Sequence, residues 1–140
     1  VAAIRYGSGA NLFTWGLNGY GQLGTGDTTN YSSPVQIGSS SWTFISTGFS
    51  FTSAIRSGGG ANLFTWGYNY YGQLGTGSSG SGGASSPVQI GSSTWTFVDS
   101  STLVNGMIGI RSGTGQASIW GTPTGFSLGE SFITGVGTKR

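Results

Sequence analysis

A long internal repeat constrains the fold of this chain more than any other feature. Residues 10–26, ANLFTWGLNGYGQLGTG, return at 61–77 with only two positions changed. A second block, SSPVQIGSSSWTFI at 32–45, returns at 85–98, again with two changes. The repeat therefore has a period of 51 to 53 residues. Such a period is typical of proteins built from successive copies of one supersecondary unit, including propellers and solenoids.

The repeat divides the chain into two clear units and a shorter third one. Trp120 and Gly121 repeat the Trp-Gly pair of the first two units, but the residues after them diverge. An atypical last unit is expected where a repeat array is capped. We predict a single repeat domain over 1–140, with units at 6–56, 57–111 and 112–140, the last degenerate and partial.

Each full unit contains four segments with the pattern of short β-strands. LFTW, PVQI and WTFI carry apolar residues at every second position, which is the period of a half-buried strand. TSAIR supplies a fourth segment, and glycine-rich stretches such as 57–60 separate the segments as turns. The sequence therefore predicts an all-β fold of four-stranded antiparallel propeller blades, in an incomplete ring of roughly 2.75 blades.

The composition restricts the chemistry that the chain can perform. It has no histidine, no cysteine and only 6% charged residues, whereas charged residues average about 25% of globular sequences. Without these side chains there is no Ser-His-Asp triad and no imidazole or thiolate metal site. Asp27, Asp99 and Glu130 do not occupy equivalent repeat positions, so they suggest no acid/base pair. We predict a non-catalytic protein without cofactor or metal.

The charge distribution also limits the partners. The net charge of +2 comes from Lys139 and Arg140, and the rest of the chain is balanced. Because no basic stripe is present to neutralise phosphates, we predict no nucleic-acid partner. No apolar run approaches the length of a membrane span. A low-charge, cysteine-free chain rich in glycine, serine and threonine predicts a virion or an extracellular or cell-surface location.

Tryptophans recur at fixed positions of the units. They alternate with other apolar residues, which favours packing in the blade core over a role as ligand platforms. The candidate core residues are Trp15, Trp42, Trp66, Trp95 and Trp120.

The loop after each LFTW segment is the candidate contact site. Tyr68 and Tyr70 replace Leu17 and Gly19 in an otherwise copied loop, and they add to tyrosines that both copies share. Tyrosine supplies rigid amphipathic contact area, as in antibody paratopes. The candidate contact residues are Asn18, Tyr20, Tyr68, Asn69, Tyr70 and Tyr71.

The segment Trp-Gly-x-Asn-x-Tyr-Gly-Gln-Leu-Gly-x-Gly, at 15–26 and 66–77, resembles the signature of the regulator of chromosome condensation repeat. The resemblance covers essentially the whole chain. The low content of charged residues is similar to that of bacterial and bacteriophage members of the family. It implies β-propeller blades of four antiparallel strands. The family's founder is an exchange factor for a small GTPase that binds chromatin, but its basic extension is absent here and its usual histidine is replaced by Phe51.

These observations predict a structural or interaction module: a virion decoration or fibre component, or a cell-surface adhesion protein, acting through protein–protein contacts. The alternative is a lectin-like protein that completes a propeller by homo-oligomerisation and binds glycans. Because fewer than three blades leave open sheet edges, we expect other chains as partners, through self-association or a larger assembly. The strand around Ala2–Arg5 is predicted to close a blade whose other three strands are missing. Phe132–Val136 is predicted to replace Pro-Val-Gln-Ile in a last blade that lacks its Trp-Thr-Phe strand.

Overall fold

The computed structural model describes residues 1–122, except 8, 10, 61, 81 and 101–104, and these residues form β-strands and no helix. The predicted all-β fold is confirmed. Accordingly, this part of the chain contains no helix with the length and apolarity needed to cross a membrane. The strands are β1 Ala2–Ile4, β2 Leu12–Gly16, β3 Tyr31–Gln36, β4 Trp42–Thr47, β5 Phe51–Arg56, β6 Leu63–Gly67, β7 Ala84–Gln89, β8 Trp95–Ser100, β9 Asn105–Arg111 and β10 Ala117–Thr122.

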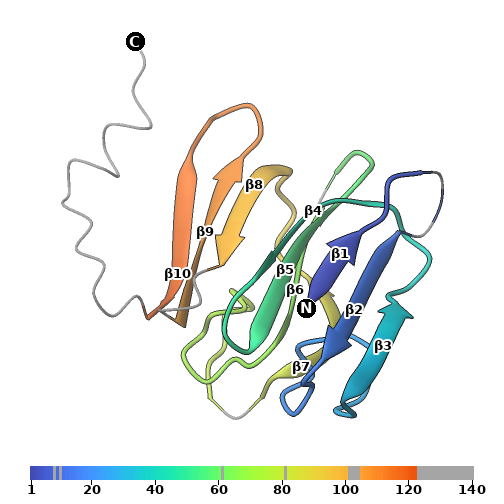
Figure 1. Ribbon diagram of the computed structural model, residues 1–140. Helices are drawn as coiled ribbons and strands as arrows, with labels where there is room; N and C mark the ends of the chain where they lie inside the picture. The colour runs from blue at the N-terminus through green and yellow to red at the C-terminus, as the bar shows by residue number, and fades with distance from the viewer. Residues whose placement is uncertain (8, 10, 61, 81, 101–104, 123–140) are drawn as a thin grey trace.

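The strands form three antiparallel sheets that stand side by side (Figure 1). The middle sheet has the order β4-β5-β6-β7 and is the four-stranded blade that the sequence predicts. The first sheet is β1-β2-β3, and the third is β8-β9-β10. Strands that follow each other in the chain are neighbours in the sheet because short turns connect antiparallel pairs.

The first strand belongs to the same sheet as the strands that follow it. β1 pairs with β2, with Ala3 opposite Phe13, and the Arg5 amide donates to the Asn11 carbonyl at 2.9 Å to close the hairpin. The prediction that the strand around Ala2–Arg5 closes a blade whose other strands are missing is therefore wrong. A tight hairpin places β1 beside β2, in the position that β5 has in the middle sheet.

The Trp-Thr-Phe strand of the third sheet is also present. β8 carries this motif, starts at Trp95 and pairs with β9. The prediction of a last blade without its Trp-Thr-Phe strand is therefore wrong, because this strand precedes the Trp-Gly strand of the same sheet. The segment Phe132–Val136 lies outside the described residues.

The sheets are out of phase with the sequence units. β4 and β5 come from the unit at 6–56, whereas β6 and β7 come from 57–111, and all four pair in one sheet. Backbone hydrogen bonds therefore cross the boundary between units. The division into three units stays a prediction about the sequence, while the blade at 42–89 is the structural unit.

Apolar side chains are buried between neighbouring sheets. One cluster joins the first and second sheets and contains Leu12, Ile37, Trp42, Ala54 and Trp66. A second cluster joins the second and third sheets and contains Phe51, Ile55, Leu63, Leu74, Ile90, Trp95, Val98 and Met107. The core is therefore repeated once at each blade boundary, as expected for a stacked repeat protein.

The five candidate core tryptophans differ in their burial. Trp42, Trp66 and Trp95 are buried, and Trp120 is half-buried against the second cluster. Trp15 is half-buried and belongs to neither cluster. The tryptophans that face another described sheet thus belong to a cluster or pack against one, and Trp15 does neither.

The Gly-Gln-Leu-Gly turn of one blade is covered by a tryptophan of the next. A Cβ atom on Gly24 would lie 2.7 Å from the indole nitrogen of Trp66, and one on Gly75 would lie 2.7 Å from that of Trp120. Both glycines also have positive φ. The repeated glycine is therefore required by the close approach of the neighbouring indole.

Asparagine side chains tie each sheet to the next. The Asn62 amide nitrogen donates to the Trp95 carbonyl at 3.0 Å, and the Asn62 amide oxygen accepts from the Trp95 backbone N–H at 2.7 Å. Asn11 makes the same two bonds with Trp42, at 3.0 and 2.8 Å. Both pairs are buried, so each asparagine satisfies backbone groups that water does not reach.

We expect Asn62→Ala to lower the free energy of unfolding by about 2 kcal/mol, because two buried backbone groups of Trp95 lose their partners. Urea unfolding of the variant measures this loss. Ser92→Ala, at an exposed position, is the control and should change stability by less than about 0.5 kcal/mol. Equal stability of the two variants would contradict a role for Asn62 in joining the sheets.

Candidate functional site: the tyrosine-bearing loops

The candidate contact loops lie at one end of the sheets. The loop between β2 and β3, the β4–β5 hairpin and the loop between β6 and β7 are all at the lower end in Figure 1. In an antiparallel meander every second connection returns to the same end, so loops of successive units become neighbours. The hairpin that carries Tyr6 lies at the opposite end.

Asn18 and Asn69 hold these loops from the inside. The Asn18 side chain accepts from the Leu23 N–H at 2.9 Å and donates to the Asp27 carbonyl at 3.0 Å. Asn69 accepts from the Leu74 N–H at 3.0 Å. Both asparagines are fully buried. Their predicted place on an exposed contact surface is therefore corrected, since their amides satisfy the loop backbone instead.

Four tyrosines from the two loops form one group, the tyrosine cluster: Tyr20, Tyr68, Tyr70 and Tyr71. The ring of Tyr20 lies 4.7 Å from that of Tyr68, which stacks on Tyr70 at 6.2 Å with an interplanar angle of 11°. Tyr71 meets Tyr70 edge-on at 5.1 Å. Tyr20 and Tyr70 are 55% and 56% exposed, while Tyr68 is half-buried between them. The cluster thus joins two blades and presents ring surface to the solvent.

The hydroxyl groups of the cluster are available as hydrogen-bond donors. Burial raises the pKa of Tyr68, and the neighbouring phenols of Tyr71, Tyr20 and Tyr70 raise it further. Tyr68 therefore stays protonated at neutral pH. Tyr31 donates to Asp27 at 2.7 Å, whereas the four hydroxyls of the cluster bond to none of the residues that the structure describes.

A cavity of about 460 Å³ opens beside the tyrosine cluster. It is lined by Tyr20, Tyr68 and Tyr70, and the hydroxyl-bearing Thr28 and Ser85 lie on its wall. None of the described residues that line it carries a charged side chain. The cavity is therefore suited to a neutral ligand with apolar surface.

A second cavity of about 590 Å³ adjoins the first, because Gly19 and Tyr20 line both. Leu17 and Phe49 line it and are 74% and 78% exposed. Val1 also lines this cavity, and its backbone nitrogen donates to the Trp15 carbonyl at 2.9 Å. Leu17 and Phe49 were not among the predicted contact residues, although an aromatic residue in the Gly48-Phe49-Ser50 turn between β4 and β5 is a signal that could have indicated Phe49.

Asp27 anchors the first of the two loops. Its carboxylate accepts from the hydroxyls of Tyr31 at 2.7 Å and Thr25 at 2.9 Å, and from the backbone N–H of Thr29 at 3.0 Å. The hydrogen bond from Tyr31 is the main cause that lowers the pKa of Asp27, followed by those from Thr29 and Thr25. Asp27 is thus a structural carboxylate whose acceptor sites are occupied.

We expect Asp27 to make stability depend on pH. Because its pKa is lowered on folding, its contribution is fully present above the ordinary pKa of 3.8 and is lost as the pH falls below that value. Asp27→Ser, which copies Ser78 of the second loop, should remove this dependence. Urea unfolding of both proteins between pH 2 and 6 measures it. Parallel pH profiles would contradict the assignment.

Three arginines recur at the opposite end of the sheets, and each lies over an aromatic ring. The distances from guanidinium carbon to ring centre are 5.2 Å for Arg5 and Phe13, 4.6 Å for Arg56 and Phe64, and 5.4 Å for Arg111 and Trp95. These contacts are cation–π pairs within the blades.

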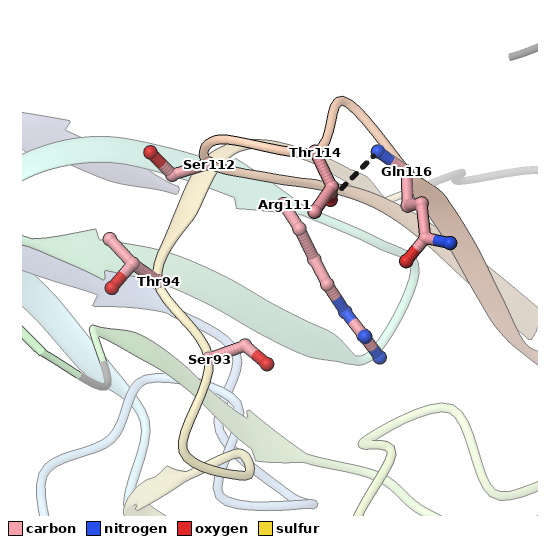
Figure 2. Close-up of a pocket in the computed structure, with 6 residues that line it drawn as sticks. All are labelled: Ser93, Thr94, Arg111, Ser112, Thr114 and Gln116. Atoms are coloured by element: carbon pink, nitrogen blue, oxygen red, sulfur yellow. Dashed lines mark hydrogen bonds between the residues drawn. The ribbon is translucent and has the colours of Figure 1, made fainter. Parts of the chain in front are cut away.

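A polar hollow of about 400 Å³ lies beside the last of these arginines (Figure 2). Ser93 and Thr94, just before β8, and Arg111 and Gln116, from the β9–β10 hairpin, line it. Gln116 holds the sequence position of Asn62, which joins its sheet to the next. We therefore interpret this hollow as part of the surface on which a further blade packs. The tyrosine cluster remains the candidate functional site. Among the described residues, no group of three or more acidic, histidine or cysteine side chains could hold a metal ion.

Antiparallel sheets that stand side by side, with their cores at the blade boundaries, define the chain as part of a β-propeller. The sequence model of the Regulator of chromosome condensation (RCC1) repeat matches residues 10–55 and 61–101, more than half of the chain. The chain therefore belongs to the RCC1 repeat family, and the predicted resemblance is confirmed.

Known proteins share both the sequence pattern and the fold. The ultraviolet-B receptor UVR8 of Arabidopsis thaliana is 42% identical over 73 residues, which cover 50% of this chain and 16% of the receptor. Human WBSCR16 superposes with a TM-score of 0.68 at 22% identity, over 86% of this chain and 30% of that one. Yeast RCC1 (Prp20), solved bound to Kap60, gives 0.68 at 17% identity, over 86% and 29%. The chain thus spans less than a third of each of these proteins.

Proposed function

We propose that this chain is a non-catalytic interaction module that binds a protein partner through the tyrosine cluster. The main observation in support is that the rings of Tyr20 and Tyr70 are exposed. Leu17 and Phe49 are exposed at the same end of the sheets. Grouped exposed apolar side chains mark interaction sites, and tyrosine is enriched in protein interfaces. Support also comes from yeast RCC1, which was solved with a protein partner.

The chain itself supplies a matched variant for the test. Tyr68→Leu/Tyr70→Gly gives the second loop the residues of the first, Leu17 and Gly19, in a loop sequence that the protein already folds. The double variant therefore removes half of the tyrosine cluster without introducing a foreign loop.

We would pan a phage-displayed library of random dodecapeptides on the protein and measure the affinity of the enriched peptides for both forms. We expect binding about tenfold or more weaker to Tyr68→Leu/Tyr70→Gly, as for the loss of interface hot spots. Tyr6→Ala, at a 98% exposed position on the opposite end, should bind like the wild type. The proposal is contradicted if no peptide is enriched, or if the double variant binds equally well.

A lectin-like function is the second candidate. Thr28 and Ser85 line the same cavity as the exposed tyrosines, and none of its described lining residues is charged. Sugars bind to such combinations of apolar faces and polar groups. A glycan array probed with the wild type and with Tyr68→Leu/Tyr70→Gly tests this candidate. Binding that the double variant loses would support it, and absence of binding would exclude it for the glycans on the array.

We further propose that the module acts on a virion or at a cell surface, within a larger assembly or by self-association. This proposal is supported by composition, since only 6% of the residues are charged and cysteine is absent. Surface biotinylation of intact particles or cells should label the protein without lysis. Labelling only after lysis would contradict this location.

A further inference from the structure

The two adjoining cavities form an extended site across two blades. They share Gly19 and Tyr20 on their walls, so an extended ligand that lies against Tyr20 can contact both cavities. A compact ligand would fill one cavity, whereas an extended segment contacts both. The shape therefore favours a linear ligand.

The cavity walls favour a ligand without charge. Among the described residues, no acidic or basic side chain lines either cavity, and the nearby carboxylate of Asp27 is occupied by four hydrogen-bond donors of its own loop. A charged group placed here would lose hydration without gaining an ion pair. The ligand should accordingly be neutral along the length that contacts the site.

The amide oxygens of three loop side chains are already in use. Gln22 accepts from the Tyr20 N–H and Gln73 from the Tyr71 N–H, each at 2.9 Å, while Asn69 accepts from its own loop. The side-chain groups left for a ligand are the hydroxyls of the tyrosine cluster and the amide nitrogens of Gln22 and Asn30, which line the second cavity and bond to none of the described residues. This inventory is sparse for a glycan, which presents many donors and acceptors at once, but it suits a ligand that offers apolar rings and a few carbonyl acceptors.

Resting on the proposed function, we infer that the tyrosine cluster binds a neutral, proline-rich peptide segment in the polyproline II conformation. Pyrrolidine rings pack against the exposed faces of Tyr20 and Tyr70, and the tyrosine hydroxyls donate to peptide carbonyls. The carbonyls of a polyproline II helix have no internal hydrogen bonds, so they are free to accept. Such a segment is already extended in solution and loses little entropy when it binds an aromatic groove.

Fluorescence anisotropy of fluorescein-labelled decaproline, titrated with the protein, tests the inference. A labelled (Gly-Ser)5 peptide is the extended, neutral control without rings, and unlabelled maltohexaose is the glycan competitor. We expect saturable binding of decaproline, about tenfold weaker binding by Tyr68→Leu/Tyr70→Gly, and unchanged binding by Tyr6→Ala. (Gly-Ser)5 and maltohexaose should neither bind nor compete.

Each other outcome overturns the inference. The site does not select proline-rich segments if the binding of decaproline does not saturate, or if decaproline binds the double variant equally well. Displacement of decaproline by maltohexaose leads to the same conclusion. The proposed function is judged separately by the peptide library. If enriched library peptides need Tyr68 and Tyr70 but contain no excess of proline, the inference fails while protein binding through the tyrosine cluster stands.

Discussion

Trp66→Ala should lower the free energy of unfolding by about 3–5 kcal/mol, because it empties the centre of the core between the first and second sheets. Trp66 is fully buried, meets Trp42 edge-on at 6.0 Å and covers the turn at Gly24. The loss should therefore reflect both the removed indole and the cavity left behind. Urea unfolding of the wild type and the variant measures it.

Two further variants separate packing from polar effects. The indole nitrogen of Trp66 has no hydrogen-bond partner among the described residues, so Trp66→Phe should cost much less stability than Trp66→Ala. Tyr6→Ala removes an exposed aromatic ring and should change stability by less than about 0.5 kcal/mol. A loss below about 1 kcal/mol for Trp66→Ala would show that the blade boundary is not packed as described.

Gly67→Ala should be destabilising by about 3 kcal/mol, for two reasons that add. Gly67 has φ of 105°, which costs an alanine about 1–2 kcal/mol. Its Cβ would also lie 2.5 Å from the Ser50 carbonyl oxygen and 2.7 Å from the Phe51 Cα, and neither backbone group can move without breaking the pairing of β5 with β6.

Gly58 and Gly59, two consecutive glycines between β5 and β6, serve as controls for this prediction. Gly58 has φ of 110° but open space around its Cβ position, so Gly58→Ala should show the backbone strain alone. Gly59 has open space and no positive φ, so Gly59→Ala should be close to neutral. Thermal or urea unfolding should rank the three variants in this order. Similar values for Gly67→Ala and Gly58→Ala would contradict the steric part of the argument.

The strands were predictable because their signals are local. The alternation in LFTW and WTFI predicts β2, β6, β4 and β8, and their identity across the repeats reinforces each assignment. Sheet membership was not predictable in the same way. The sequence unit at 6–56 begins in the connection between β1 and β2, and these two strands belong to one sheet. Because each unit was equated with one blade, β1 was assigned to the wrong sheet. The hairpin bond between Arg5 and Asn11 decides its place.

The grouping of the tyrosines was foreshadowed by the sequence only in part. The replacement of Leu17 and Gly19 by Tyr68 and Tyr70 singled out the loops whose tyrosines the structure brings together, because a change in an otherwise copied sequence is visible without a structure. The same comparison could not tell exposed tyrosines from buried asparagines. Asn18 and Asn69 are constant in both copies because they hold the loops, and their constancy carried no information on exposure.

The contact between the two loops is a property of the fold alone. Tyr20 and Tyr68 are far apart in the chain, yet their rings lie 4.7 Å apart because successive blades place equivalent loops side by side. The contribution of Phe49 also depends on this stacking, since it belongs to a different turn. Local sequence patterns do not report which loops share one end of the sheets.

Hydrogen–deuterium exchange of the protein, with and without a peptide enriched from the library, tests most directly whether the tyrosine-bearing loops are the binding surface. The structure predicts that the peptide slows exchange in residues 17–30 and 68–80, on both sides of the tyrosine cluster. The polar hollow beside Arg111 should show no change. Protection confined to residues 93–94 and 111–116, with none in the two loops, would contradict the account.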